Sequence, residues 1–366
     1  MNIFPGRLGL QQRVLPSYRV PFFDMLASAC EGGMSLFAGQ ARAVESIASG
    51  EPRAAEYAPA QNIHLLNGPF YFCYQRGFLD WLFNWNPDAL IVEANPRYLS
   101  TPAAVQWMQK RGRSVIGWGL GAPPLSVSPH FPRKWGERKR GVFLNRLDAL
   151  IAYSQRGADE YAALGFPRDK IFVAHNAVVP APTIKPDDRP QTTDHLTILF
   201  VGRLQARKRI DSLLRACAEM PDSPHLVIVG DGPERENLEA LAKQVYPSAE
   251  FIGAKHGDEL KPYFTEADLF VLPGTGGLAV QEAMSHGLPV IVAKGDGTQD
   301  DLVRAENGWQ IPPGDYEALV STMKDALSDI PRLRKMGAES YRIVSQEINL
   351  EKMVEAFVGA LTQLSR

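Results

Sequence analysis

The segment from Leu269 to Val292 constrains the fold of this chain more than any other. It contains two short apolar runs, Leu269–Leu272 and Pro289–Val292, each bounded by turn-forming residues. Runs of this length and composition are typical of parallel strands buried on both faces. Between them, a group of glycines leads into a helical stretch. The segment therefore predicts a strand, a glycine turn, a helix and a second strand, which is the repeating unit of an α/β sheet.

Strand-like runs alternate with helical stretches throughout the C-terminal half. The predicted strands are Thr197–Val201, Leu226–Val229, Glu250–Ile252, Leu269–Leu272, Pro289–Val292 and Trp309–Ile311. The predicted helices are Arg209–Glu219, Pro233–Gln244, Asp258–Ala267 and Leu278–His286. Such alternation indicates a doubly wound parallel sheet.

The N-terminal half shows a weaker form of the same pattern. Its predicted strands are Gly9–Arg13, Met34–Phe37, Ala89–Val92, Ser114–Trp118, Ala149–Tyr153 and Ile171–Ala174. We interpret the aromatic stretch Phe70–Trp85 as a core-facing helix. Because 366 residues fit two domains of ordinary size better than one, we predict an N-terminal domain over residues 1–178 and a C-terminal domain over residues 196–345.

Residues 179–195 have the composition of an interdomain linker, with four prolines and few apolar side chains. At the other end of the C-terminal domain, Leu350–Leu364 predicts an amphipathic helix with Met353 and Phe357 on its apolar side. We treat residues 346–366 as a separate C-terminal segment.

Charge and cysteine content exclude several classes of protein. A formal net charge of -2 gives no reason to expect a nucleic-acid partner. The three scattered cysteines fit neither a disulfide framework nor a zinc site, and favour a reducing compartment. No signal peptide is evident, and no apolar run approaches the roughly 20 residues of a membrane-spanning helix. We therefore expect a cytoplasmic location.

Positive charges and glycines meet at the predicted strand ends. Arg203 and Lys208 follow the first strand of the C-terminal half, where two cations can clamp a diphosphate. The glycine turn at residues 274–277 opens a helix whose first amides favour an anion. Glu282, further along that helix, offers a carboxylate to sugar hydroxyls. These features predict a pocket for a nucleotide or a nucleotide sugar.

These segments together resemble the retaining glycosyltransferases of the GT-B fold, in particular the family 4-like enzymes (glycosyl transferases group 1). The matching stretches in the C-terminal half are Phe200–Lys208, Ile228–Glu234, Phe251–Gly253, Ala267–Pro273, Glu282–Ile291 and Glu306–Gly308. In the N-terminal half the match is looser, at Asp148–Ser154 and Ile171–Asn176. The opening Gln12–Phe23 resembles bacterial enzymes that build surface polysaccharides.

The resemblance implies an α/β protein with two doubly wound Rossmann-like domains facing a central cleft. The C-terminal domain would hold a UDP- or GDP-linked sugar, and the N-terminal domain would hold a glycan, lipid-linked or small-molecule acceptor. The last helix would cross back onto the N-terminal domain. Transfer would retain the anomeric configuration and would need no cofactor and no metal.

The resemblance also assigns residues. Arg203 and Lys208 would grip the diphosphate and stabilise its charge as it leaves, and Glu282 would hold the ribose hydroxyls. The donor-binding set is Gly202, Gly230, Gly253, Gly274, Thr275, Gly276, Gly277 and Leu278. The acceptor-side set is Arg19, Glu93, Trp118 and Leu120.

Two positions depart from the family pattern and leave alternatives open. Family members usually carry a second glutamate eight positions before Glu282, where this chain has Gly274, and a histidine where it has Leu120. A protein that binds nucleotide sugars without catalysis is therefore one alternative. A sugar-nucleotide epimerase is another, and so is an NAD-dependent dehydrogenase, because Gly274–Ala279 mimics a dinucleotide fingerprint.

A run of charges from Arg133 to Arg140, flanked by Phe131, Val142 and Phe143, has two interpretations. It is typical of a surface that touches anionic lipid, which would suit peripheral contact with the inner face of a membrane. It is also typical of a solvated helix face, which is the interpretation that we slightly favour.

Overall fold

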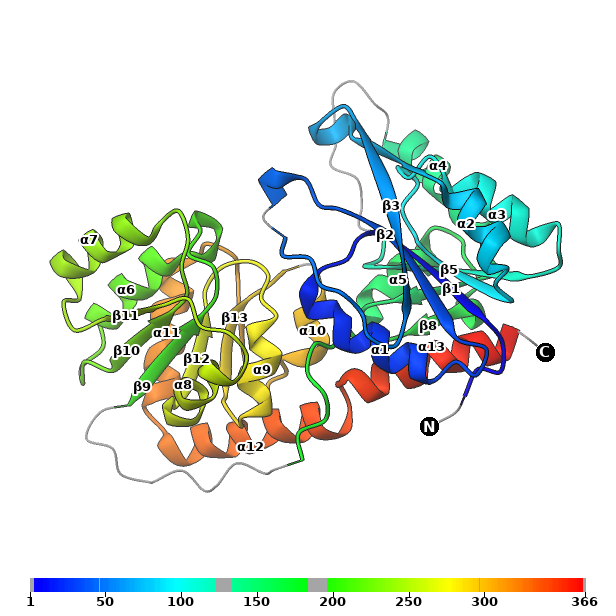
Figure 1. Cartoon of the computed structure of the whole chain (residues 1–366). Coiled ribbons are helices and arrows are strands. Elements are labelled where there is room, and N and C mark those ends of the chain that lie inside the picture. Colours follow the sequence, from blue (N-terminus) through cyan, green and yellow to red (C-terminus); the bar gives the residue numbers. More distant parts are fainter. Residues whose placement is uncertain (1–2, 46, 123–132, 184–195, 296, 365–366) are drawn as a thin grey trace. The chain divides into compact units, whose positions relative to one another are not determined.

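The computed structural model describes residues 3–45, 47–122, 133–183, 196–295 and 297–364. The chain divides into two units (Figure 1). The N-terminal unit comprises residues 1–178 together with 350–366, and the C-terminal unit comprises residues 179–349. Of the predicted linker, residues 179–183 belong to the C-terminal unit and residues 184–195 lie outside the described residues.

A single parallel sheet forms the centre of the C-terminal unit. Its strands are β9 (Thr197–Val201), β10 (His225–Val229), β11 (Glu250–Gly253), β12 (Leu269–Leu272), β13 (Val290–Ala293) and β14 (Gly308–Ile311). They lie in the order β11-β10-β9-β12-β13-β14, and every neighbouring pair is parallel. This is the strand order of a doubly wound dinucleotide-binding sheet. The six predicted strands are confirmed, each shifted by no more than one residue at either end.

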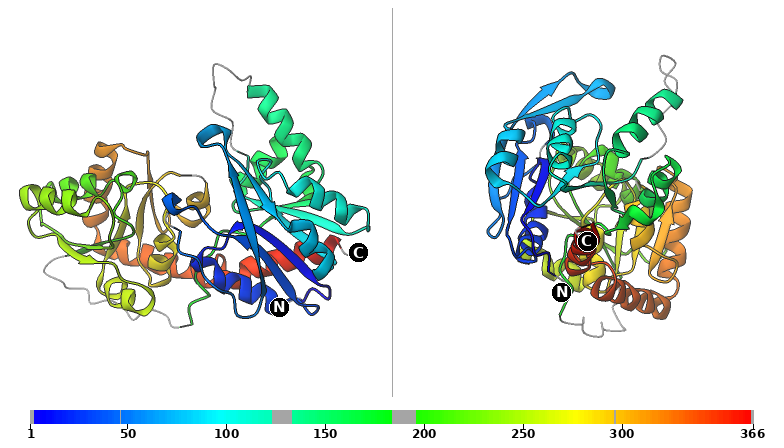
Figure 2. Two further views of the ribbon diagram at one scale, coloured as in Figure 1. Left: turned by 45° about the horizontal axis from the view of Figure 1, so that its top comes forward. Right: turned by 90° about the vertical axis from the view of Figure 1, so that its right-hand side faces the viewer.

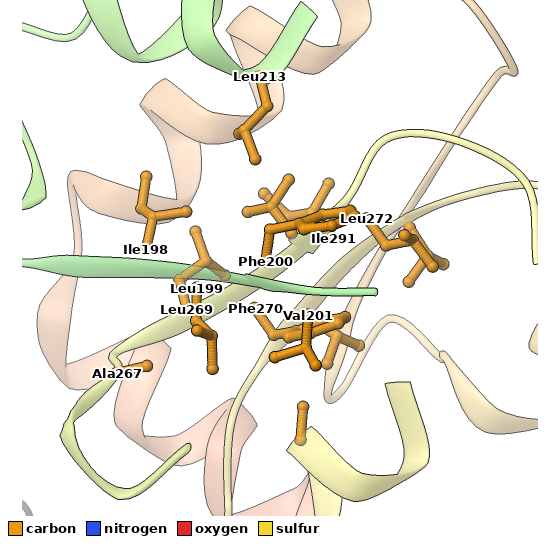
Figure 3. Packing of buried hydrophobic residues seen from close by; sticks show 14 of the residues in the cluster. Ile198, Leu199, Phe200, Val201, Leu213, Ala267, Leu269, Phe270, Leu272 and Ile291 are labelled. Atoms are coloured by element: carbon orange, nitrogen blue, oxygen red, sulfur yellow. The ribbon is translucent and has the colours of Figure 1, made fainter. Parts of the chain in front are cut away.

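Both faces of this sheet are apolar and covered. The helices are α6 (Ile210–Ala218), α7 (Arg235–Val245), α8 (Lys261–Glu266), α9 (Ala279–Ser285), α10 (Thr298–Leu302), α11 (Tyr316–Leu327) and α12 (Ile330–Gln346). Figure 3 shows Ile198 and Phe200 of β9 on the side that faces Leu213 of α6, whereas Val201 lies on the opposite side. Successive residues of a strand point to opposite faces, so this packing requires apolar residues at every position.

The sheet of the N-terminal unit is larger and is not entirely parallel. Its strands are β1 (Leu8–Val14), β2 (Met34–Gly39), β3 (Glu56–Leu65), β4 (Phe72–Arg76), β5 (Ala89–Glu93), β6 (Ser114–Gly119), β7 (Ala149–Ala152) and β8 (Ile171–Val173). They lie in the order β4-β3-β2-β1-β5-β6-β7-β8. Only the β3–β4 pair among these described strands is antiparallel. The six predicted strands are confirmed, with ends that differ by up to two residues.

The interpretation of Phe70–Trp85 as one helix is wrong. Its first part is the edge strand β4, which pairs with the unpredicted strand β3 from Gln61↔Arg76 to Leu65↔Phe72. Gly77, in the left-handed region at φ +85°, then turns the chain into helix α2 (Phe78–Trp85). The sequence pattern does not distinguish strand from helix in this stretch, because closely spaced aromatic residues suit a strand and a buried helix equally well.

Four further helices and several short turns complete the N-terminal unit. The helices are α1 (Val20–Ser28), α3 (Thr101–Gln109), α4 (Arg133–Leu144) and α5 (Gln155–Ala163). The 3-10 turns are η1 (Ser17–Arg19), η2 (Ala43–Glu45), η3 (Gly68–Phe70) and η4 (Arg168–Lys170). Ser154 caps α5, because its hydroxyl accepts a hydrogen bond from the amide of Gly157.

The C-terminal helix α13 (Leu350–Leu364) has the predicted bounds and belongs to the N-terminal unit. The views in Figure 2 show it running alongside α1. The ring of Phe357 lies 4.9 Å from that of Phe22 and 5.0 Å from that of Trp118, measured between centroids. The predicted apolar side of the helix is therefore buried in the core of this unit.

Candidate functional site

Open α/β sheets bind ligands outside the carboxyl ends of their strands, at the point where the strand order reverses. In the C-terminal unit this point lies between β9 and β12. The loop after β9 carries Arg203 and Lys208, and the loop after β12 carries the glycine turn. The structure thus brings the predicted catalytic cations and the turn at residues 274–278 to one end of one sheet.

Lys208 connects the two loops. Its ammonium donates to the carbonyl oxygens of Thr275, at 2.9 Å, and Gly276, at 2.5 Å. The residue is only 6% exposed, and burial together with the positive charge of Arg207 lowers the pKa of Lys208 to about 8. Among the described residues, this buried ammonium contacts two neutral carbonyls and no carboxylate. An anion bound beside it would therefore gain a strong, charge-assisted partner.

The glycine turn packs directly on the backbone of η5 (Ala206–Lys208). The amide of Thr275 donates to the carbonyl of Arg207 at 3.1 Å. A Cβ atom at Gly274 would stand 2.2 Å from that same carbonyl oxygen and 2.4 Å from the Cα of Lys208. The missing side chain at Gly274 therefore has a packing reason: this close approach leaves no room for a second glutamate.

The turn also offers amide donors. Within the described residues, nothing accepts a hydrogen bond from the backbone N–H groups of Gly276, Gly277 or Leu278. Glu282 lies beyond them on α9, partly buried, and burial raises the pKa of its carboxyl. Its carboxylate likewise finds no hydrogen-bond donor in the described part of the chain. Free donors and a free acceptor therefore lie on the same strand-to-helix segment.

A pocket of about 670 Å³ opens at the carboxyl ends of β9, β10 and β11. It is lined by Val201, Gly202, Arg203, Val229, Gly230, Asp231, Gly232, Pro233, Ala254, Lys255 and His256. The loops after β9 and β10 touch here, since a Cβ at Gly230 would meet the carbonyl oxygen of Gly202 at 2.0 Å. Arg203 is exposed at this pocket and pairs with no carboxylate among the described residues. The volume suits a nucleoside.

Sequence reasoning named three of these lining residues and missed others. Gly202, Arg203 and Gly230 were predicted, and Gly253 ends β11 just before the lining residue Ala254. Arg207, whose guanidinium reaches the Thr275 carbonyl at 3.3 Å, was not predicted. The side chains of Asp231, Lys255 and His256 also line the pocket and were not among the predicted site residues. Their position directly after a strand could have identified them.

On the acceptor side, Arg19 and Trp118 are buried rather than presented to a ligand. Arg19 is 5% exposed, and its guanidinium bonds to the carbonyl of Ala177 and the side chain of Asn176. It lies 5.5 Å from the centroid of the Trp118 ring and 5.3 Å from that of Tyr153. A buried guanidinium needs carbonyls and aromatic faces as partners. This geometry favours a packing role for both residues over the predicted contact with an acceptor.

Glu93 and Leu120 lie at the carboxyl ends of neighbouring strands. Glu93 ends β5, which adjoins β1 where the strand order of the N-terminal sheet reverses. Its carboxylate accepts a hydrogen bond from the amide of Arg13 at 3.2 Å, and burial raises its pKa to about 7. Leu120 follows β6 and is 47% exposed. Of the four acceptor-side residues, Glu93 thus has the position that the sheet topology favours.

The basic run forms helix α4 (Arg133–Leu144). Arg138 and Lys139 are exposed on it, Val142 is exposed, and Phe143 is buried. Phe131, which precedes the run, lies outside the described residues. In the described ranges, no helix combines the length and the apolar character needed to cross a bilayer.

Comparison with solved structures identifies the class of fold. The chain is similar to the crystal structure of Anabaena Alr3699/HepE in complex with UDP, with a TM-score of 0.70 and 16% identity over 98% of this chain and 99% of that one. This likeness establishes the fold, which is GT-B with two Rossmann-like domains. Residues 183–343 match the family Glycosyl transferases group 1. The C-terminal unit is therefore a glycosyl transferases group 1 domain.

Curated relatives are transferases of sugars. The chain is 35% identical to the sulfoquinovosyl transferase SQD2 of Arabidopsis thaliana over 138 residues, which are 36% of this chain but only 26% of that protein. It is 23% identical to the lipopolysaccharide core biosynthesis glycosyltransferase LpsE of Rhizobium meliloti over 299 residues, 76% of this chain and 87% of the relative. The likeness to LpsE thus extends through most of both chains.

Proposed function

We propose that the protein is a glycosyltransferase that moves a sugar from a nucleoside-diphosphate sugar to a glycan, lipid-linked or small-molecule acceptor with retention of configuration. One observation carries this proposal. Within the described ranges, two cations without a carboxylate partner, backbone amides without an acceptor and a carboxylate without a donor gather where the strand order of the group 1 domain reverses. Such an arrangement is suited to a ligand that combines a diphosphate with sugar hydroxyls.

Different residues of the site would bind different parts of the nucleotide sugar. Arg203, Lys208 and the amides of residues 276–278 would hold the diphosphate and stabilise the negative charge that grows as the bond to the sugar breaks. Such preorganised electrostatic stabilisation needs no metal ion. Glu282 would accept hydrogen bonds from the ribose hydroxyls, and its raised pKa fits a carboxylate that lacks a partner until the ligand arrives. A charge-assisted hydrogen bond contributes about 1.5–3 kcal/mol.

The base and the acceptor belong to the same proposal. The 670 Å³ pocket beside Arg203 would take the nucleoside, either uridine or guanosine. The solved relative Alr3699/HepE binds UDP, which supports uridine. The N-terminal unit would hold the acceptor. The exposed Arg138 and Lys139 of α4 support peripheral contact with an anionic membrane surface from the cytoplasmic side.

A thermal-shift panel of UDP, GDP, ADP, dTDP and CMP tests the proposal. A nucleotide at about 100 times its dissociation constant should stabilise the C-terminal unit by roughly 2.7 kcal/mol. The shift should occur with UDP or GDP, disappear in Arg203→Ala, and persist in Arg215→Ala, which removes an exposed arginine on α6. A panel without any shift, or a shift that Arg203→Ala leaves unchanged, would contradict the assigned pocket.

A non-catalytic nucleotide-sugar binder remains the second candidate, because Gly274 and Leu120 lack the functional groups that related enzymes have there. Release of UDP or GDP from the corresponding sugar nucleotides separates the two. Turnover by the wild-type protein that falls in Arg203→Ala establishes the transferase. Tight nucleotide binding without turnover on any tested acceptor would favour the binder.

A further inference from the structure

Large apolar side chains are exposed along the antiparallel pair formed by β3 and β4. We refer to residues 61–76, which comprise the paired part of β3, the connection and β4, as the β3–β4 ribbon. Five of its apolar side chains are between 40% and 66% exposed: Ile63, Leu65, Leu66, Phe70 and Tyr74. Neither the core of the N-terminal unit nor the nucleotide site uses these side chains.

The pairing of the two strands places these side chains on one face of the ribbon. Ile63 pairs with Tyr74, and Leu65 pairs with Phe72. Residues directly opposite each other in an antiparallel pair point to the same side and touch. Residues two apart along a strand also share a face. The two exposed residues of the connection lie within two positions of the Leu65–Phe72 pair, so they extend the same apolar surface.

The opposite face of the ribbon is polar and buried. Asn62 donates to the carbonyl of Arg13 at 2.7 Å and to that of Gln40 at 3.0 Å. Gln75, which is 1% exposed, donates to the carbonyl of Gln12 at 3.0 Å. Antiparallel sheets with one solvated face normally have apolar residues inside and polar residues outside. The ribbon has the reverse arrangement, which folding of the unit by itself does not require.

Most of the ribbon is free of charged residues. Residues 61–75 read QNIHLLNGPFYFCYQ, a stretch without Asp, Glu, Lys or Arg. Protein segments that dock on anionic lipid combine apolar side chains with Lys and Arg. The centres of protein interfaces are instead depleted of charge and enriched in Tyr and Phe. The composition of the ribbon therefore favours a protein partner over a lipid surface.

The lack of charge also favours a second copy of this chain as the partner. In a two-fold symmetric contact, the same patch on both copies meets itself. Any charge near the centre of such a patch would lie close to an identical charge and would be repelled. An uncharged apolar patch avoids this repulsion, and it needs no second complementary surface.

The area of the patch is sufficient for such a contact. A large apolar side chain has roughly 150–250 Å² of surface, so five that are about half exposed present about 500 Å². The largest apolar patch of a typical monomer measures about 300–600 Å² and often has a function. Two copies together would bury about 1,000 Å², which is where specific protein interfaces begin.

The contact would involve the face of the ribbon and not its edge. The outer edge of β4 is already paired at its centre. There the amide of Cys73 donates to the carbonyl of Arg97 at 3.0 Å, and the amide of Leu99 donates to the carbonyl of Cys73 at 2.8 Å. A strand added by a partner would have to displace these hydrogen bonds, whereas side chains packing on the apolar face would leave them intact.

We propose that the apolar face of the β3–β4 ribbon is the contact surface of a homodimer, in which the ribbons of two copies of this chain pack face to face. The inference goes beyond the proposed transferase function and does not depend on it, because the ribbon contains no residue of the nucleotide site.

Sedimentation velocity of the full chain over a range of micromolar concentrations tests the proposal. The wild type should form a species of twice the chain mass whose share rises with concentration. Leu65→Lys puts a cation on each of the two facing patches and should weaken the dimer by about tenfold or more. Leu65→Glu should do the same. An equal mixture of the two variants should associate again, because opposite charges then face each other.

Phe83→Lys is the matched control. Phe83 is 71% exposed on α2, and α2 packs on the other side of β3, since Phe78 of α2 and Ala60 of β3 belong to one buried cluster. This variant should dimerise as the wild type does. Thermal unfolding of each variant should give the wild-type midpoint, because every replaced side chain is exposed.

A wild type that stays monomeric at every concentration would overturn the proposal, and so would a Leu65→Lys variant that dimerises with wild-type affinity. An equal mixture of folded Leu65→Lys and Leu65→Glu that remains monomeric would contradict face-to-face packing. Binding of a monomeric wild type to phosphatidylcholine vesicles, abolished in Leu65→Lys, would assign the apolar face to a membrane instead of a second copy.

Discussion

The two units place chemically different groups at equivalent points of similar sheets. Where the strand order reverses in the C-terminal unit, the described residues provide Lys208 with carbonyls but no counter-ion, and they provide Glu282 with no donor. At the corresponding point of the N-terminal unit, Arg13 and Glu93 lie among hydrogen-bond partners of their own. One site is electrostatically incomplete, and the other is balanced.

This difference shows how one architecture can serve two kinds of ligand. An incomplete site gains most from a ligand that supplies the missing charge, which is what a diphosphate does. A balanced site gains little from a charged ligand and instead offers fixed acceptors and donors to hydroxyl groups. Fold alone does not decide between these ligands, since the strand order around the two points is alike.

The largest expected effect comes from filling the space at Gly274. Gly274→Ala places a Cβ about where the Arg207 carbonyl oxygen and the Lys208 backbone stand. We expect a loss of about 1–3 kcal/mol in the free energy of unfolding, and loss of the nucleotide-induced stabilisation because the two loops separate. Urea unfolding with and without UDP or GDP measures both.

Gly359→Ala is the control for this experiment, because a Cβ at Gly359 meets no atom within 4 Å and the residue lies inside α13. It should be neutral or stabilising by up to about 1 kcal/mol. Wild-type stability and nucleotide binding in Gly274→Ala would show that the turn does not depend on this contact.

A medium effect is expected from titrating Lys208. With a pKa of about 8, its ammonium is charged at pH 7 and largely neutral at pH 9. Nucleoside-diphosphate affinity should therefore fall by about tenfold between pH 7 and pH 9, measured by calorimetry. Lys208→Ala should bind weakly and should lack this fall, whereas an equal pH dependence in both proteins would assign the titration to another group.

The smallest effect concerns the balanced site, in which Glu45 accepts hydrogen bonds from Arg13 and Arg42. The pKa of Glu45 lies at about 2 in the folded protein, below its ordinary value of 4.5, so its carboxylate stabilises the fold above pH 4.5 and loses this contribution as the pH falls toward 2. Glu45→Gln should lower the free energy of unfolding at pH 7 by about 1 kcal/mol. The difference from the wild type should narrow between pH 6 and pH 3; a constant difference would argue against the ion pairs.

The regular parts of the fold could be predicted because they depend on local patterns. Continuous apolar runs such as Leu269–Leu272 identify strands that are buried on both faces. The edge strand β4 was not predicted because its aromatic residues also suit a buried helix, and its neighbour β3 was not predicted because it is partly polar and its pairing depends on contacts distant in sequence. Partly polar strands therefore need the tertiary structure to be seen.

The candidate site likewise has features that the sequence predicts and features that only the tertiary structure shows. Arg203 and Lys208 are evident in the sequence because they follow a strand and a glycine. The sequence does not reveal that Lys208 contacts carbonyls 67 and 68 positions away, nor that the backbone of Arg207 and Lys208 leaves no space for a side chain at Gly274. Arg19 was predicted to contact the acceptor, and its burial beside the rings of Trp118 and Tyr153 favours packing instead, which only the fold can show.

The return of α13 to the N-terminal unit has a consequence for how the molecule is made. The residues of the C-terminal unit form one uninterrupted insertion between residue 178 and residue 350 of the other unit. During synthesis, the C-terminal unit has its complete core before α13 leaves the ribosome, whereas the first-made unit still lacks the helix that covers Phe22 and Trp118. The unit that is synthesised first is therefore the one whose folding is completed last.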